Sequence, residues 1–225
     1  MALLKKLTEC LNYKLEPIIF LSTMGDIEKI GHEFLIRVKG DKSASKEMLD
    51  QIINDPHNNR EYLSWKKVMI TEIIENDPAT KIAINLAPQQ LLYEGTWDFL
   101  AEMSPYTKNI VIEITEKPSI NVSLDITKCL QSIREYGYCA ALDDIGKQQN
   151  DYHMVMDNIN LLSYLKVSLL DLAQLDDEQK LFVVLGWKKV ASRHDIKLIV
   201  EGVDNEKMVQ RLAKLGCLQQ GYFWD

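Results

Sequence analysis

The sequence predicts an α/β fold, a TIM-like (β/α)8 barrel formed by a single domain that spans residues 1–225. Eight short runs of strand-forming residues recur along the chain, and amphipathic helical patterns separate most of them, which is typical of βα units and a parallel sheet. A length of 225 residues suits such a barrel at the small end of its range. The competing fold is an open doubly wound sheet, but no glycine-rich phosphate loop follows the first run.

The strand runs are short, and six of them are strongly apolar, as expected for parallel strands that are covered on both faces. We place the eight strands at residues 17–21, 33–38, 81–85, 109–114, 138–142, 162–167, 196–200 and 218–223.

Five stretches between these runs carry apolar residues at helical spacing. Candidate N-caps precede the first stretch (Ser43 or Ser45) and the last (Asp204 or Asn205), and glycines end the third at Gly137 and the last at Gly216. The apolar faces are Met48, Leu49, Ile52 and Ile53; Tyr62, Trp65, Met69 and Ile73; Leu124, Leu130 and Ile133; Leu181, Val184 and Leu185; and Met208, Val209, Leu212 and Leu215.

The composition excludes several classes of protein. The 26 Lys and Arg residues against 33 Asp and Glu residues give a net charge of −7, which argues against non-specific nucleic-acid binding. No apolar run approaches the length of about 18 residues that a membrane span needs, and the N-terminus lacks the layout of a signal peptide. Four scattered cysteines without a CxxC pair indicate reduced thiols, so we expect a cytoplasmic protein.

Polar residues close several of the strand runs. Asn85, Glu113, Asp143 with Asp144, Lys166 and Glu201 each stand at the end of a run or near it, at intervals of 28, 30, 23 and 35 residues from Asn85 to Glu201. Each interval is close to one βα unit. In a barrel the carboxyl ends of the strands converge on one face, so these side chains are expected to meet there, together with Glu33 from the second run.

Such a group is rich in oxygen donors. Glu33, Asn85, Glu113, Asp143, Asp144 and Glu201 would suit Mg²⁺ or Mn²⁺, and an adjacent Asp-Asp pair could bridge two ions. Each residue also has an ordinary structural explanation, since acids after strands often cap helices and Asn85 could form an Asx-turn. Glu113 and Lys166 need partners wherever they are buried.

At these residues the sequence resembles the EAL family of cyclic di-GMP phosphodiesterases, from about residue 15 to residue 223. The segments that carry the resemblance fall in family order: Glu33-Phe34-Leu35, Asn85-Leu86-Ala87-Pro88, Glu113-Ile114-Thr115-Glu116, Asp143-Asp144-Ile145-Gly146, Lys166-Val167-Ser168, Glu201-Gly202-Val203-Asp204 and Gln220-Gly221-Tyr222. Single segments of this kind are weak evidence, but seven in order are specific.

The resemblance implies hydrolysis of cyclic di-GMP to linear pGpG with Mg²⁺ or Mn²⁺, as two ions. It implies that Glu33, Lys166 and Glu201 take part in catalysis. One ion would be held by Glu33, Asn85, Glu113 and Asp143, and the other by Asp143 and Asp144 with Glu201 nearby. It also assigns Leu35, Arg37 and Gln220 to substrate binding and Glu116 to bracing the loop that follows Asp144.

Several positions depart from the family pattern. Phe34 replaces an alanine, Glu16 a glutamine and Ser168 an aspartate, and residues 147–152 lack the usual loop sequence. These changes leave open a second function, a regulatory module that binds cyclic di-GMP or a partner protein without hydrolysing it. A barrel hydrolase of another phosphate ester is a third reading. The family often dimerises, so a homodimer is also an expectation.

Overall fold

A closed barrel of eight strands forms the centre of the computed structural model, which describes residues 9–38, 40, 42–115, 124–147 and 150–225. Around the barrel the strands follow the order β1, β9, β8, β7, β6, β5, β4 and β2, and β2 pairs with β1 to close it. The predicted fold class is therefore confirmed. The strands are β1 (Leu11–Leu21), β2 (Ile27–Val38), β4 (Ile82–Leu86), β5 (Ile110–Ile114), β6 (Cys139–Leu142), β7 (Tyr164–Ser168), β8 (Lys197–Glu201) and β9 (Leu218–Gln219), with a short β3 (Lys42–Ser43) beside β2.

The first strand runs against the others. β1 pairs antiparallel with both β2 and β9, whereas the pairs from β2 to β9 through β4, β5, β6, β7 and β8 are parallel. The βα unit that a (β/α)8 barrel has after its first strand is absent here, because only residues 22–26 separate β1 from β2. A connection this short can form a hairpin but not a crossover.

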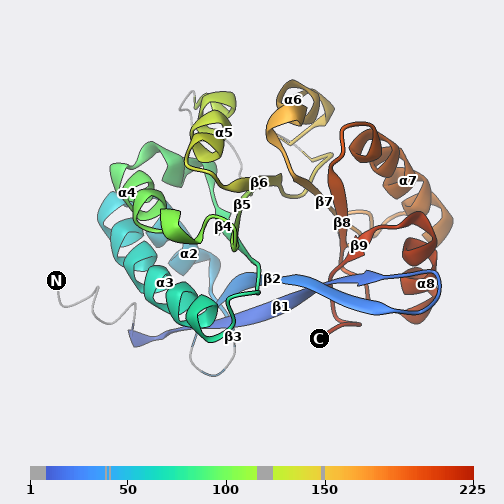
Figure 1. Cartoon of the computed structure of the whole chain (residues 1–225), viewed down its shortest axis with the longest axis horizontal. Helices are drawn as coiled ribbons and strands as arrows, with labels where there is room; N and C mark the ends of the chain where they lie inside the picture. Colours follow the sequence, from blue (N-terminus) through green and yellow to red (C-terminus); the bar gives the residue numbers. More distant parts are fainter. Residues whose placement is uncertain (1–8, 39, 41, 116–123, 148–149) are drawn as a thin grey trace.

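Helices cover the barrel on the sides away from this hairpin. In Figure 1 they form an arc around the strands, and the long β1–β2 pair closes the remaining side. Their bounds are α2 (Lys46–Ile53), α3 (Pro56–Asn76), α4 (Glu94–Glu102), α5 (Ile126–Glu135), α6 (Tyr152–Asn158), α7 (Asp177–Arg193) and α8 (Glu206–Leu215). Short 3-10 turns lie at Pro88–Leu92, Ser104–Tyr106 and Ile159–Leu161. No helix among the described residues is both long and apolar enough to cross a membrane.

The helix termini resolve the alternatives that the sequence left open. The Ser45 side chain accepts a hydrogen bond from the Met48 N–H and so caps α2, whereas Ser43 lies in β3. Asn205, not Asp204, caps α8. Gly216 ends α8 in the left-handed conformation, at φ 64°, that glycine adopts at low cost.

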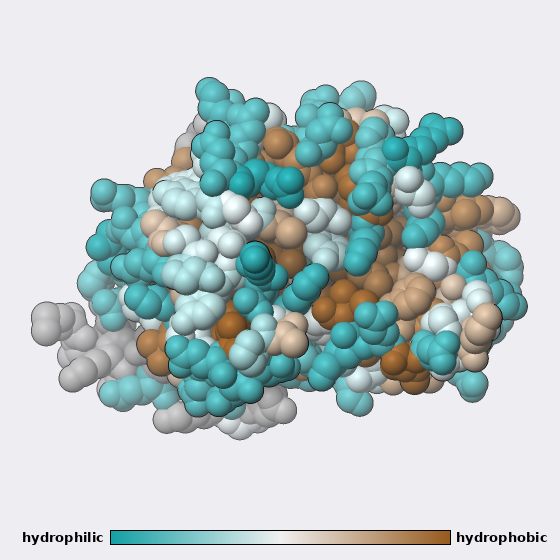
Figure 2. Space-filling model, viewed as in Figure 1, coloured by the Kyte–Doolittle hydropathy of each residue, from teal (hydrophilic) through white to brown (hydrophobic). Residues whose placement is uncertain are grey.

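Alternation along the strands separates two apolar layers. One face of each strand joins the large core beneath the helices, for example through Ile82, Ile84 and Leu86 of β4. The other face points into the barrel, where Ile18, Ala83, Ala141, Tyr164, Ile199 and Leu218 form a small cluster that we call the apolar floor. From outside, the face in Figure 2 is mainly hydrophilic at its periphery, with hydrophobic side chains showing nearer its middle.

The apolar floor predicts a difference between two chemically identical substitutions. Ile199 is 2% exposed within the floor, so Ile199→Ala should leave a cavity and lower the free energy of unfolding by about 2–5 kcal/mol. Ile27 on the hairpin is 63% exposed, and Ile27→Ala should change it by less than about 0.5 kcal/mol. Urea unfolding of both variants checks this, and equal effects would contradict the packing described here.

Candidate metal centre

The polar side chains of the barrel interior stand one step above the apolar floor. Successive residues of a strand point to opposite faces, so the residue two positions after each floor residue points inward again. Ala83 is followed in this way by Asn85, Ala141 by Asp143, Tyr164 by Lys166 and Ile199 by Glu201. We call the resulting set the polar layer: Glu16, Glu33, Asn85, Glu113, Asp143, Lys166, Glu201 and Gln220.

Lys166 lies at the centre of the polar layer and is fully buried. Its Nζ lies 2.7 Å from Glu113 Oε2, 2.7 Å from Glu201 Oε1, 2.9 Å from Glu33 Oε2 and 3.6 Å from Asp143 Oδ1. These acids come from four different strands or strand ends, as the spacing in the sequence predicts. Lys166 of β7 therefore links the middle of β2 with the carboxyl ends of β5, β6 and β8.

Glu33 is held from the remaining side of the barrel. Asn85 Nδ2 donates to Glu33 Oε1 at 2.5 Å, and Gln220 Nε2 donates to Glu33 Oε2 at 2.6 Å. Gln220 also lies beside Glu16, which stands directly opposite Glu33 in the β1–β2 register. Gln220, expected from the family resemblance to bind substrate, thus contacts a candidate metal ligand in this structure.

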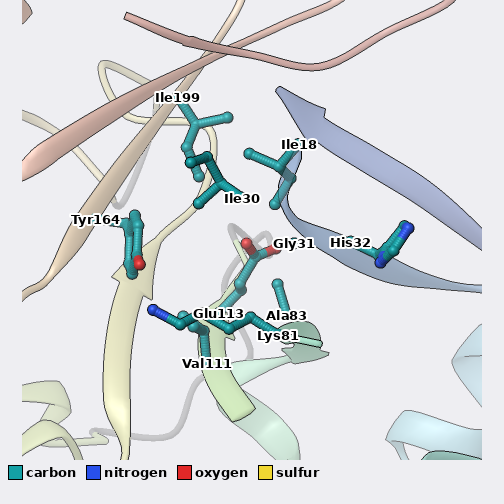
Figure 3. Close-up of a pocket in the computed structure, with 10 residues that line it drawn as sticks. All are labelled: Ile18, Ile30, Gly31, His32, Lys81, Ala83, Val111, Glu113, Tyr164 and Ile199. Atoms are coloured by element: carbon teal, nitrogen blue, oxygen red, sulfur yellow. The ribbon is translucent and has the colours of Figure 1, made fainter. Parts of the chain in front are cut away.

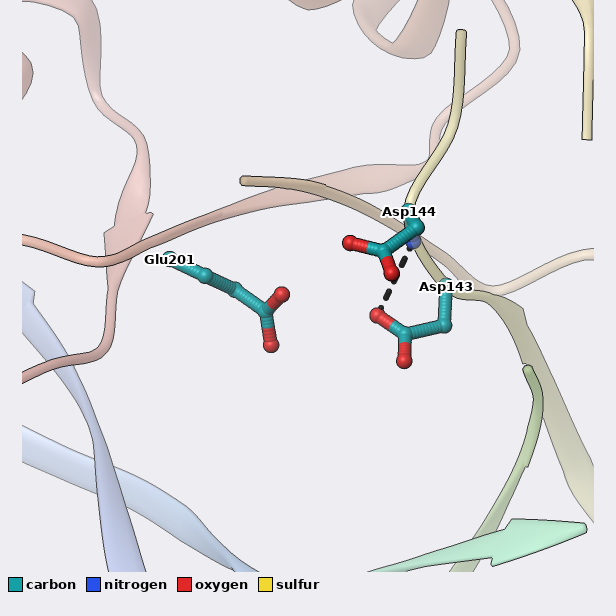
Figure 4. Close-up of side chains that lie close together, drawn as sticks. All are labelled: Asp143, Asp144 and Glu201. Carbon is teal, nitrogen blue, oxygen red and sulfur yellow. Dashed lines mark hydrogen bonds between the residues drawn. The ribbon is translucent and has the colours of Figure 1, made fainter. Parts of the chain in front are cut away.

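Three carboxylates lie close together at the rim of the barrel. Each of Asp143, Asp144 and Glu201 offers an oxygen within 4.8 Å of the others, and Figure 4 shows all three side chains turned toward a common space. Asp144 adopts a left-handed conformation at φ 47°, which is uncommon for a residue with a side chain, and its N–H donates to Asp143 Oδ1. The Asn150 side chain donates to the Asp143 carbonyl and helps to hold this turn.

Burial and crowding shift the pKa values of these acids. Burial raises the pKa of Glu201 to about 8, and burial together with Asp143 and Asp171 raises that of Asp144 to about 7. Burial also raises the pKa of Glu113 well above its usual range. Burial has the same tendency at Glu33, but Lys166 and the two amide donors outweigh it and lower its pKa. Without a cation, one lysine does not keep all of these acids ionised.

The donor set fits divalent cations. Asn85 Oδ1 and Glu113 Oε1 are buried without a hydrogen-bond partner, and such atoms are costly to leave unsatisfied. Both oxygens belong to residues expected to hold one ion, and the three rim carboxylates belong to those expected at the second. Carboxylate and amide oxygens are the ligands that Mg²⁺ and Mn²⁺ prefer.

The lower end of the barrel is narrow and mainly apolar. Figure 3 shows Glu113 above Ala83, with Ile18 and Ile199 lining the same small space, whose volume is about 20 Å³. This space has room for about one water molecule. Access to the polar layer is therefore from the opposite end, at the carboxyl ends of the parallel strands.

A larger cavity of about 300 Å³ opens there beside Leu35, Arg37 and Asn85. Leu35 and Arg37 follow Glu33 at steps of two residues and share its face of β2. Phe34 also lines this cavity, but from the other face of β2, where its ring is stacked on Tyr13 at 4.9 Å and lies against Trp65 at 5.9 Å. The bulk that replaces alanine in the family signature is thus directed mainly into the helix layer.

The structure adds residues that the sequence analysis did not single out. Lys66 of α3 is fully buried and donates to the main-chain oxygen of Asn85 at 3.2 Å. Its position four residues after Tyr62, on the apolar face of the helix, was a signal that it would be buried. Asp171, which follows β7, lies close enough to Asp144 to raise the pKa of its carboxyl, and it pairs with Lys147. Ser168 is buried in β7. No pattern in the sequence connected Asp171 with Asp144.

The loop at residues 147–152 departs from the family pattern, and residues 148–149 of it lie outside the described residues. The same holds for Glu116, so its expected bracing role stays a prediction.

The raised pKa values of these acids predict how the stability of the fold depends on pH in the absence of divalent ions. Glu201 has a pKa of about 8 in the folded chain against 4.5 as its ordinary value, so the folded state binds its proton more tightly than the unfolded state does. This contribution to stability is complete below pH 4.5 and is lost as the pH rises through 8. In EDTA, the melting temperature of Glu201→Gln should therefore fall less between pH 5 and 8 than that of the wild type. If the melting temperatures of the two proteins fell equally between pH 5 and 8, the raised pKa of Glu201 would be contradicted.

Comparisons with known proteins agree with this geometry. The family model for the EAL domain matches residues 17–225. A cyclic di-GMP phosphodiesterase, PdeA of Borreliella burgdorferi, is 28% identical over 156 residues, which are 63% of this chain and 22% of that relative. The matched region is also 22% of a second curated relative, from Synechocystis, so the match spans about a fifth of either relative.

Solved structures show the same fold at low identity. The phosphodiesterase PaMucR, in a complex with c-di-GMP, superimposes with a TM-score of 0.75 at 20% identity, covering 98% of this chain and 95% of the other. The S helix-GGDEF-EAL portion of LapD from Vibrio cholerae, bound to c-di-GMP, gives a TM-score of 0.77 at 17% identity, covering 100% and 56%. With a family model that matches nearly the whole barrel, this chain belongs to the EAL domain family.

Proposed function

We propose that this chain is a metal-dependent phosphodiesterase that hydrolyses cyclic di-GMP to linear pGpG. The observation that carries the proposal is the polar layer, in which a buried lysine lies among four carboxylates while two further oxygens lack any partner. Structural ion pairs do not need this excess of acids, whereas a pair of divalent cations does. The similarity to a named cyclic di-GMP phosphodiesterase supports the same substrate.

The ions are Mg²⁺ or Mn²⁺ in this proposal. Glu33, Asn85, Glu113 and Asp143 would hold one ion, and Asp143, Asp144 and Glu201 would hold the other. When bound, such ions lower the pKa of a water molecule and stabilise charge on the phosphate oxygens.

The residues of the chain then have distinct tasks in the reaction. Lys166 Nζ holds the attacking water by a hydrogen bond, and Glu201 Oε1, 2.7 Å from Nζ, is placed to receive the proton that this water loses. The water oxygen adds to phosphorus, the bond from phosphorus to O3′ breaks, and O3′ takes up a proton from solvent, to which Glu201 returns the proton that it received. Arg37 pairs with a phosphate through its planar guanidinium, and Leu35 contacts a base, since both line the cavity at the mouth.

Hydrolysis predicts a contrast between two glutamates of β2. Glu33→Gln should lower the rate of pGpG formation at least about 100-fold, because it weakens an ion site and leaves Lys166 with one carboxylate fewer. Glu28→Gln makes the same chemical change at an exposed position of the strand and should keep the wild-type rate. The assay follows conversion of cyclic di-GMP to pGpG in Mn²⁺ by chromatography. Equal rates for Glu33→Gln and the wild type would contradict the proposal.

A second function is favoured by particular residues. Ser168 replaces an aspartate of the family pattern, so β7 has one carboxylate fewer. Glu16 replaces a glutamine and adds a carboxylate beside Gln220. A chain altered in this way would serve as a regulatory module that binds cyclic di-GMP or a partner protein, as a monomer or homodimer in the cytoplasm. Calorimetry with cyclic di-GMP in Ca²⁺ separates the two: binding without turnover in Mn²⁺ supports the module, and turnover supports the enzyme.

A further inference from the structure

Lys66 is a buried cationic side chain that the proposed reaction does not use. It lies on α3 and is 0% exposed. The Tyr62 ring centre is 4.8 Å from its Nζ and the Phe34 ring centre 5.8 Å, and its hydrogen bond goes to the Asn85 main-chain oxygen at 3.2 Å. No carboxylate among the described residues forms an ion pair with it. A buried amine without an ion-pair partner costs stability, and a methionine would fill the same space at lower cost.

The sheet explains why the Asn85 carbonyl needs a donor. In β4 the carbonyls point alternately to the two neighbouring strands. The Lys81 oxygen accepts from His32 N–H of β2, and the Leu86 oxygen accepts from Thr115 N–H after β5, so the Asn85 oxygen faces the β2 side. The pairing of β2 with β4 ends at Phe34 and Ile84, one residue earlier.

Beyond that point the edge of β2 on the β4 side pairs with β3, while the other edge stays paired with β1. Ile36 stands opposite Tyr13 of β1, and Arg37 stands opposite Ser43 of β3. The Lys66 amine therefore occupies the position at which a further β2 amide would have donated to β4. It supplies the missing donor from a helix instead of from the sheet.

The residue fixed in this way is a candidate ion ligand. The Asn85 side chain donates from Nδ2 to Glu33, and its Oδ1 is buried without a partner. We propose that Lys66 is a positioning residue that sets Asn85 Oδ1 for the ion held with Glu33 and Glu113, by anchoring the end of β4. This inference rests on the proposed function. Groups that orient metal ligands in this way typically change metal affinity 10–100-fold when they are removed.

Manganese titration of the whole chain tests the inference without any turnover. Lys66→Met removes the donor and keeps the apolar stem, and free Mn²⁺ is counted by its electron paramagnetic resonance signal. We expect one of the two ions to bind at least about ten-fold more weakly, while the other ion, at Asp143, Asp144 and Glu201, keeps its affinity. Lys67→Met is the matched control, because Lys67 is the next residue of α3 and pairs with Glu102 at the surface.

A double-mutant cycle with Asn85→Ala separates positioning from general loosening of the fold. If Lys66 acts through Asn85, the double variant should bind Mn²⁺ no more weakly than Asn85→Ala alone. In turnover assays, excess Mn²⁺ should restore kcat of Lys66→Met, with KM for cyclic di-GMP within two-fold of the wild type. If Lys66→Met does not fold, Lys66→Leu, which also lacks the donor, takes its place in the cycle.

The outcomes are distinct. A wild-type chain that binds no Mn²⁺ overturns the proposed function. If the wild type and Lys66→Met both bind two Mn²⁺ ions with equal affinity, the role of Lys66 is overturned and the proposed function stands. Losses that simply add in the double variant also overturn that role.

Discussion

The structure of the barrel mouth depends on the charge balance around Lys166. Four carboxylates surround one buried amine, so the negative charge of the layer exceeds what the amine neutralises. Burial raises the pKa values of several of these acids, which means that protons take up part of the excess. A layer that must be neutralised by protons when cations are absent is suited to binding cations, because each ion displaces protons from groups already held in place.

The apolar floor makes this arrangement possible. Asn85, Asp143, Lys166 and Glu201 each lie two positions beyond a residue of the apolar floor. The alternation of each strand therefore places apolar side chains at the floor and polar side chains in the next layer. Glu113 is 1% exposed at the narrow lower end, and this burial strengthens its interaction with Lys166. The geometry of the site thus follows from strand register, and loops supply only Asp144 and its neighbours.

Much of this could be predicted from the sequence, since strand runs, helix caps and the polar residues at strand ends are local patterns. Asn85, Glu113, Asp143, Lys166 and Glu201 could be placed together because parallel strands converge at one end. The antiparallel β1 was missed because hairpins and crossovers are distinguished by the length of the connection, and the predicted strands were too short at 17–21 and 33–38. Asp171 lies near Asp144 because of the path of a loop. Loops have no periodic sequence pattern from which such a neighbour could be predicted.

Phe34, which departs from the family signature, lies beside the buried amine of Lys66. Taken alone, a phenylalanine in place of alanine beside Glu33 suggests obstruction of the site. In the structure its ring faces Tyr13, Trp65 and the Lys66 amine, all on the helix side of β2. The aromatic face helps to accommodate a buried amine, and the amine in turn holds the end of β4. The substitution thus places an aromatic ring between the cavity at the barrel mouth and the amine that contacts the end of β4.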